Sequence, residues 1–183
     1  FIKVDANDGG RTRIPALKEE REGVRYKVED NKKKGRIFHQ AFFKENPSPL
    51  PSFGEVTYDA PRFEVKRINN HDIRAVIKMI SPYKAPGPNG VANTVFTHNP
   101  GVLVPFLGPI FQATFETNHY PARWKLSRTV VLRKPGRTDY GLAGSYRPIA
   151  LMDTMAKILA ACVCNAIMKE VEKQGLLPAN QFG

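Results

Sequence analysis

Cysteine is scarce in this sequence, and long hydrophobic runs are missing. Only two of the 183 residues are cysteines, Cys162 and Cys164. Two residues apart on a helix they would face different directions and could not form a disulfide. No second cysteine pair or suitably placed histidine completes a zinc site. We therefore expect both to be reduced core residues of an intracellular protein. No run of about 18 apolar residues is present, so no membrane span is expected, and no signal peptide is visible.

The common catalytic motifs are also missing. The sequence has no GxGxxG fingerprint, no GxxxxGK[ST] loop and no GxSxG nucleophile elbow. The four histidines are scattered without the spacing of metal ligands. Asp139 falls in an expected loop and Asp153 at an expected helix start, which suits a helix cap better than a metal ligand. The residues themselves thus indicate binding groups, and no catalytic or metal-ligating residue is assigned.

Positive charge is what the sequence has in excess. Lysine and arginine number 28 against 17 acidic residues, a net charge of +11. Residues 121–157 hold eight of these cations and two aspartates, so this segment carries more than half of the excess. Such a balance favours a polyanionic partner, with nucleic acid ahead of a membrane surface. A basic protein without such a partner is the alternative.

The pattern of apolar residues predicts mainly helices. Residues 1–35 are expected to form a solvated helix plus loops, and residues 37–42 a segment that docks on the rest. The prolines of residues 46–54 predict an extended linker. Helices are expected over residues 69–82, with Asn70 as N-cap, over 102–118, and over 153–175, capped by Asp153 or Thr154 and ended by Gly175. Candidate core residues of the last two helices are Leu103, Phe106, Leu107, Ile110, Phe111, Ile158, Leu159, Cys162, Val163, Ala166, Ile167 and Val171.

Two strands are predicted over residues 128–134 and 146–152, as an antiparallel ribbon with a basic tip at 135–145. Proline removes a backbone donor, so Pro148 is tolerable only on an edge strand, which a two-stranded ribbon provides. It also biases Arg147 toward an extended conformation. A fixed arginine presents a planar set of donors to phosphate oxygens. Alternatively, Arg147 pairs with Asp139 or Asp153.

The stretch KAPGPNG at residues 84–90 predicts a stiff turn. Gly87 and Gly90 permit unusual backbone angles or close approaches, and Lys84 precedes them. Such a turn either holds a phosphate or simply connects two helices. Trp124, the single tryptophan, is expected to anchor the ribbon to the helices rather than to stack on bases.

Five ordered blocks, KAPGPNG, PARWK, TVVLRKPGR, YRPIALMDTMAKIL and LLPANQFG, resemble the reverse transcriptase of non-LTR (LINE-type) retrotransposons. The resemblance covers about residues 69–183. It implies an α+β fold: a helix-rich fingers subdomain with an antiparallel β-ribbon, at the start of a right-hand polymerase and truncated before the catalytic palm. Residues 66–183 would be the fingers and the start of the palm. Residues 1–65 would be the linker or extension that precedes the polymerase.

The resemblance also implies roles for individual residues and partners. The partners would be an RNA template, an RNA/DNA duplex, a deoxynucleotide triphosphate, and the missing palm and thumb of the same polypeptide, with no membrane. The parent would work inside the cell, in the nucleus or cytoplasm. Nucleotide binding falls to Arg147, Lys134 and Arg133, and nucleic-acid binding to Lys84, Gly87, Gly90, Arg128, Arg137 and Lys157.

Two departures from the family pattern bear on activity. Asn89 stands where the family usually has aspartate, which loses a negative charge. The family's polymerase carboxylates belong to later blocks that these residues do not include, and two-metal phosphoryl transfer needs them. We therefore expect Mg²⁺ to be used by a full-length parent only and this chain to be inactive alone. The alternatives are a free-standing basic nucleic-acid-binding module, or an inert relic whose apolar stripe at 158–171 lacks a partner.

Overall fold

The computed structural model describes residues 14–45, 54, 57, 60–61, 63–64, 66–178 and 180. They form two compact units: residues 1–56 with 129–150 make unit 1, and residues 57–128 with 151–183 make unit 2. Nearly all of the expected proline linker at 46–54 lies outside the described residues. The units group the chain differently from a division at residue 65, because the ribbon tip packs with the N-terminal residues. The assignment of 1–65 to an extension and 66–183 to a polymerase stays a prediction.

Unit 1 begins with a hairpin that the sequence analysis missed. Strands β1 (Leu17–Arg21) and β2 (Val24–Val28) pair antiparallel, with Leu17 opposite Val28. Glu22 and Gly23 both have positive φ, 50° and 78°, as the two central residues of a tight hairpin turn require. The expectation of a solvated helix plus loops over residues 1–35 was therefore wrong for residues 17–28, because charged side chains masked the Glu-Gly turn, whereas residues 31–35 are helical.

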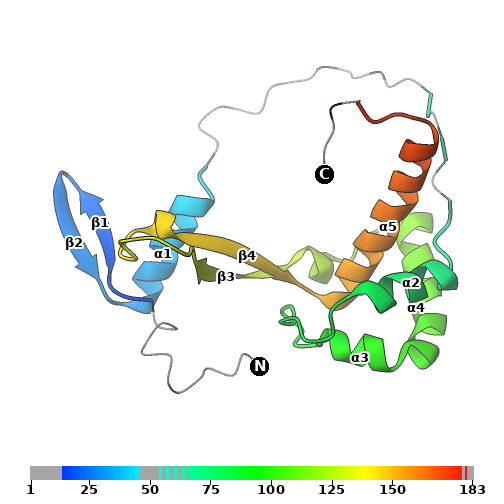
Figure 1. Ribbon diagram of the computed structural model, residues 1–183, viewed down its shortest axis with the longest axis horizontal. Coiled ribbons are helices and arrows are strands. Elements are labelled where there is room, and N and C mark those ends of the chain that lie inside the picture. Colours follow the sequence, from blue (N-terminus) through cyan, green and yellow to red (C-terminus); the bar gives the residue numbers. More distant parts are fainter. Residues whose placement is uncertain are drawn as a thin grey trace. The chain divides into compact units, whose positions relative to one another are not determined.

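Helix α1 (Asn31–Phe42) follows this hairpin in unit 1 (Figure 1). The Asp30 side chain caps it by accepting from the Lys33 amide at 2.9 Å. Phe38 is buried with Leu17 and Tyr146, and its ring meets Tyr146 edge-on with centroids 4.9 Å apart. The predicted docking of this segment is confirmed.

Unit 2 is a helical cluster (Figure 1). It contains α2 (Asn70–Met79), α3 (Asn93–His98), α4 (Pro100–Glu116), the 3-10 turn η1 (Ala122–Lys125) and α5 (Thr154–Lys173). Helix α2 packs against both α4 and α5. Its cap is Asn69 rather than the expected Asn70, because the Asn69 side chain accepts from the Asp72 amide while Asp72 accepts from the Asn69 amide.

Trp124 lies in the core of unit 2 and is only 8% exposed. Its ring meets Phe111 and Tyr120 edge-on. Trp124 thus packs in the core, as expected in preference to base stacking, while its anchoring of the ribbon stays a prediction. The core is completed by Ile68, Ile73, Val76, Ile77, Phe96, Val104, Leu107, Ala156, Ile158, Leu159 and Cys162.

Helix α4 buries only part of the face that the sequence analysis expected: Leu107 and Phe111 lie in the core as predicted, but Phe106 and Ile110 do not. Val104, Leu107 and Phe111 are buried, whereas Phe106 is 67% exposed and Ile110 42% exposed. The helix is apolar on nearly all sides, so periodicity alone could not select the buried stripe. Close packing selects it, because Gly108 lies so near the Asn70 side chain that a β-carbon there would collide with it.

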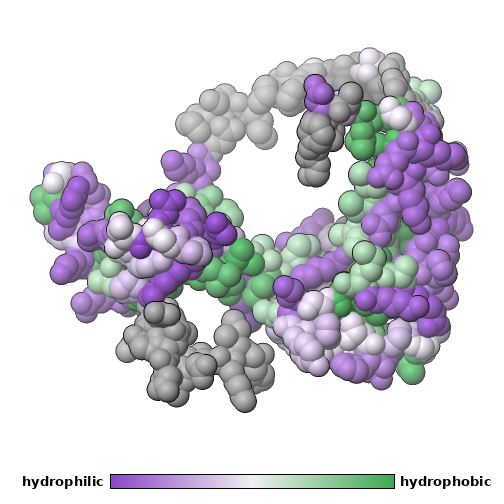
Figure 2. Space-filling model, viewed as in Figure 1, coloured by the Kyte–Doolittle hydropathy of each residue, from purple (hydrophilic) through white to green (hydrophobic). Residues whose placement is uncertain are grey.

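Helix α5 is buried only in its first half. Cys162 is buried as expected, but Cys164 is exposed, so the prediction of two core cysteines was wrong for the second. Ile167 and Met168 are each 38% exposed and line an apolar groove beside α4. Figure 2 shows hydrophobic surface along this helix beside a hydrophilic one. Gly175, with φ 62°, ends the helix as predicted.

The ribbon consists of β3 (Ser127–Arg133) and β4 (Tyr146–Met152), joined through a tip loop that ends in the 3-10 turn η2 (Ala143–Ser145). The two strands form a sheet of their own and run in opposite directions (Figure 1). Pro148 thus lies on an edge strand, as predicted. The α+β class is confirmed, while the right-hand polymerase fold stays a prediction. No helix in the described residues is long and apolar enough to cross a membrane.

Candidate nucleic-acid and nucleotide interface

The tip of the ribbon is an internally bonded loop. The Lys134 Nζ donates to the carbonyl oxygen of Gly144 at 2.9 Å, and the Lys134 amide donates to Ser145 at 2.9 Å. The Ser145 hydroxyl donates to the carbonyl of Asp139 at 2.6 Å, and the Tyr140 hydroxyl to that of Lys134 at 2.9 Å. The structure thus uses the predicted nucleotide-binding Lys134 to close its own loop. A phosphate that binds the Lys134 ammonium would have to replace only its hydrogen bond to the Gly144 carbonyl.

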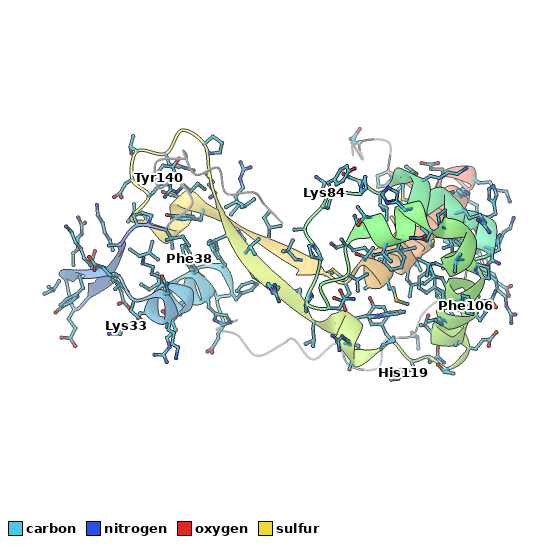
Figure 3. All side chains as sticks on the ribbon, turned by 90° about the horizontal axis from the view of Figure 1, so that it is seen from below. Lys33, Phe38, Lys84, Phe106, His119 and Tyr140 are labelled. Carbon is cyan, nitrogen blue, oxygen red and sulfur yellow. The ribbon has the colours of Figure 1, made fainter. Side chains whose placement is uncertain are left out.

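Arg133 lies against two tyrosines. Its guanidinium carbon is 5.0 Å from the centroid of the Tyr140 ring, a cation–π distance. Figure 3 shows Tyr140 in the tip loop. Burial raises the pKa of the Tyr146 hydroxyl, and the nearby Arg133 cation acts against that rise. No local pattern in the sequence predicted either tyrosine as a neighbour of Arg133, because these contacts depend on the folded loop.

Arg147 is exposed on β4, directly after the fully buried Tyr146. Neither proposed acidic partner pairs with it: the Asp139 carboxylate pairs with Lys18 at 2.6 Å, and the Asp153 carboxylate pairs with Arg123 at 3.9 Å. Within the described residues, no ion pair occupies the Arg147 guanidinium. Pro148, the next residue of the strand, favours the extended backbone on which this exposed guanidinium is carried.

The remaining predicted cations differ in exposure. Arg137 in the tip loop and Arg128 on β3 are exposed. Lys157, in the first turn of α5, is half-buried, and its amide donates to the carbonyl of Asp153 at 3.1 Å. Arg133, Lys134, Arg137 and Arg147 belong to unit 1, and Arg128 and Lys157 to unit 2.

The turn at residues 84–90 packs on the start of α5 within unit 2. Gly87 is buried, and a β-carbon there would collide with the backbone of Met152 and Asp153. The Asn89 amide donates to the Asp153 carboxylate at 3.0 Å. The close approach predicted for Gly87 is thus made to protein backbone. Gly90 has φ 73° and is exposed.

The α5 N-terminus is bonded to the residues after this turn. Asp153 is the N-cap residue, but its side chain makes no cap bond, so the expected side-chain cap was wrong. The Asp153 carboxylate, which is only 1% exposed, instead accepts the hydrogen bond from the Asn89 amide of the turn. The Thr154 hydroxyl likewise lies 2.9 Å from the Asn93 Oδ1 and 3.1 Å from the Val91 carbonyl. Lys84, the first residue of the turn, is exposed (Figure 3).

A contact that the sequence could not reveal fixes the tip from the N-terminal side. The Lys18 Nζ donates to the Asp139 carboxylate at 2.6 Å, and the Lys18 amide donates to the Gly141 carbonyl at 2.7 Å. The Lys18 hydrogen bond, followed by the Gly141 amide, holds the pKa of Asp139 below its usual value. Strand β1 thereby positions the basic loop. Among the described residues, no group of three or more His, Cys, Asp or Glu side chains could hold a metal ion.

Comparison with known proteins gives relatives of one kind. The chain is 28% identical over 119 residues to a probable RNA-directed DNA polymerase from transposon BS of Drosophila melanogaster. It is 30% identical over 112 residues to a probable RNA-directed DNA polymerase from transposon X-element, and 26% identical over 112 residues to the RNA-directed DNA polymerase from mobile element jockey, both of the same organism. These matches cover 65%, 61% and 61% of the chain. No family model matches it.

The chain spans only 13%, 12% and 12% of the lengths of these three relatives. A further match, 29% identical over 76 residues, is to a polyprotein from type-1 retrotransposable element R1 of Bradysia coprophila. The resemblance that the five sequence blocks predicted is therefore confirmed: the chain is related in sequence to the RNA-directed DNA polymerases of non-LTR retrotransposons.

Proposed function

We propose that this chain supplies the fingers of an RNA-directed DNA polymerase and that its ribbon binds the RNA template and the incoming deoxynucleotide triphosphate. The sequence relatives support the class of enzyme. The net charge of +11 supports a nucleic-acid partner. The parent protein would then be a nucleotidyltransferase that works inside the cell, in the nucleus or cytoplasm.

The observation that carries this proposal is that the Arg147 side chain is exposed and forms no ion pair with its two candidate acidic partners. This residue is the exposed cation of β4 next to Pro148, and neither Asp139 nor Asp153 neutralises it. A planar guanidinium with free donors can bind phosphate oxygens with two parallel hydrogen bonds. Lys134 and Arg133 lie at the tip end of the partner strand and would add charge near a triphosphate. The exposed Arg128, Arg137 and Lys84, with Lys157, would contact the nucleic-acid backbone.

We further propose that these 183 residues do not polymerise by themselves. Two-metal phosphoryl transfer requires carboxylates that hold Mg²⁺, and the resemblance assigns those carboxylates to later blocks. Mg²⁺ would then serve the full-length parent, whose palm and thumb would pack against these helices. The apolar groove of α5 and α4, lined by Phe115, Ile167 and Met168, supports such a covering partner.

Binding by the purified chain tests the nucleotide role. Affinities for a labelled deoxynucleotide triphosphate and for a short RNA/DNA duplex would be measured by fluorescence anisotropy, with and without Mg²⁺. Arg147→Ala should lower triphosphate affinity about tenfold, the value of one exposed charge-assisted contact, and duplex affinity much less. Arg74→Ala is the matched control, because Arg74 is an exposed arginine on α2.

Each outcome selects among the candidate functions. Equal triphosphate affinity for Arg147→Ala and Arg74→Ala would refute the nucleotide role. Salt-sensitive duplex binding without triphosphate binding would favour a free-standing nucleic-acid-binding module. A folded chain that binds neither ligand would favour an inert relic, a reading that the exposed apolar half of α5 also allows.

A further inference from the structure

A groove runs between α1 and the ribbon within unit 1. Its lining includes Phe38 and Phe42 from α1 and Thr129 and Val131 from β3. The Phe38 and Phe42 rings stack with centroids 5.7 Å apart and an interplanar angle of 12°. Figure 3 shows Phe38 on the side of α1 that faces the ribbon. The groove is therefore lined by two aromatic rings on the side of α1, and by Val131 and the hydroxyl-bearing Thr129 on the side of β3.

A stripe of four exposed side chains on α1 and its C-cap reaches the rim of this groove, which two of them, His39 and Phe43, line. Lys32, Arg36, His39 and Phe43 are spaced four, three and four residues apart, which places them on one face of the helix. Phe43 is 51% exposed, and its ring lies 5.4 Å from that of His39. This apolar ring is therefore half open to water, in line with two cations.

The chemistry of this stripe matches a single-stranded polyanion. Phosphates would meet Lys32 and Arg36, which form no ion pair in the part of the chain that the structure describes. A base would stack on Phe43, since proteins that bind single strands combine a basic track with exposed aromatic rings. A duplex keeps its base faces stacked on one another and offers no such contact. The Glu29 carboxylate lines the groove as well, and it would keep phosphates toward the rim.

We propose that the α1 stripe, Lys32, Arg36, His39 and Phe43, binds single-stranded nucleic acid with the adjoining groove. This is a second site, because its residues are separate from those that the ribbon offers to nucleotide and template. It gives the N-terminal segment a binding role of its own, beyond positioning the tip loop. It does not depend on the nucleotide role of Arg147.

The test measures binding of the complete chain to a fluorescein-labelled oligouridylate of roughly ten nucleotides, within the range of single-strand site sizes. Phe43→Leu keeps the apolar volume and removes the ring, and it should weaken binding roughly five- to tenfold. Phe43→Trp keeps a stacking surface and should bind at least as tightly as the native chain. Rescue by the second variant separates stacking from a general loss of structure.

A second pair of variants tests the cations. Arg36→Gln removes a stripe cation, whereas Lys33→Gln removes the same charge from a position on α1 that faces away from the ribbon (Figure 3). Arg36→Gln should weaken binding and reduce the slope of log K against log salt by about 0.7, the value of one phosphate contact on a single strand. Lys33→Gln should leave both nearly unchanged.

Three results would overturn the site. In the first, Phe43→Leu and Arg36→Gln bind oligouridylate as tightly as the native chain, while Arg147→Ala loses triphosphate binding. That result would rule out the site and leave the proposed function standing. Equal losses in Arg36→Gln and Lys33→Gln would mean diffuse attraction without a site. If Phe43→Leu keeps its oligonucleotide affinity but no longer self-associates in sedimentation, the Phe43 ring contacts a second copy of the chain and not a base. Weaker oligouridylate binding in Phe43→Leu beside an unaffected triphosphate affinity in Arg147→Ala would support the site and count against the nucleotide role.

Discussion

Replacing Gly87 with alanine should disrupt the junction between the 84–90 turn and α5. The added β-carbon would lie inside van der Waals contact of the carbonyl of Met152 and the amide of Asp153. Those atoms are backbone, so no side chain can rotate away to make room. The turn or the start of the helix must shift instead, and the 3.0 Å bond from the Asn89 amide to the Asp153 carboxylate must lengthen.

The size of the effect follows from these two contributions. Inserting a methyl group into a well-packed site typically costs about 1–3 kcal/mol. Weakening a hydrogen bond to a buried charged group costs about 1.5–3 kcal/mol when it is lost fully. Because the shift that relieves the clash also weakens the bond, the two are not independent, and we expect a total of about 2–4 kcal/mol.

Urea unfolding followed by the fluorescence of Trp124 measures this directly, since the single tryptophan lies in the core of unit 2. With a slope of about 2 kcal/mol per molar urea, the middle of the usual range, the midpoint should fall by about 1–2 M. Gly101→Ala is the matched control, because nothing lies within 4 Å of a β-carbon on Gly101 in α4. It should be neutral or stabilising by up to about 1 kcal/mol. A Gly87→Ala midpoint within about 0.3 M of the native value would refute the close-packing argument.

Three further predictions concern single groups. Leu17→Ala should destabilise unit 1 by about 2–5 kcal/mol, since Leu17 is fully buried; hydrogen exchange of α1 amides would show this. Because Lys18 lowers the pKa of Asp139, the bond stabilises the tip above the ordinary aspartate pKa and is lost as pH falls through the lowered value. The protection of the Lys18 amide against hydrogen exchange, relative to its unfolded rate at the same pH, should therefore fall in acid, and Lys18→Met should remove that dependence. Cys164 is exposed, whereas burial raises the pKa of Cys162 to about 11, so a thiol reagent at neutral pH should modify Cys164 first, as peptide mapping would show.

Much of the local structure could be predicted because it depends on neighbouring residues. The strands at 128–134 and 146–152 match β3 and β4 within one residue at each end, since β-branched runs and Pro148 are local signals. Helices α2 and α5 were likewise placed by their apolar spacing. The Glu22-Gly23 hairpin was missed because its strands are rich in charge and carry little apolar alternation.

The candidate site could be predicted only in part. The sequence and its resemblance placed cations on the ribbon, and Arg147 is exposed there as expected. They could not show that Lys134 bonds to Gly144 or that Arg133 lies over Tyr140. Both contacts depend on the path of a loop whose conformation is set by its own hydrogen bonds.

The sequence by itself determined the charge, the main helices and strands, and the relationship to a family, because each is written in composition, spacing or ordered motifs. The tertiary structure decided which of those residues meet. Lys18 reaches Asp139 across 121 positions, and Asn89 reaches Asp153 across 64. It also decided that Phe106 faces outward while Val104 is buried. Such choices depend on the shapes of segments far apart in the chain, which pack closely in only one way.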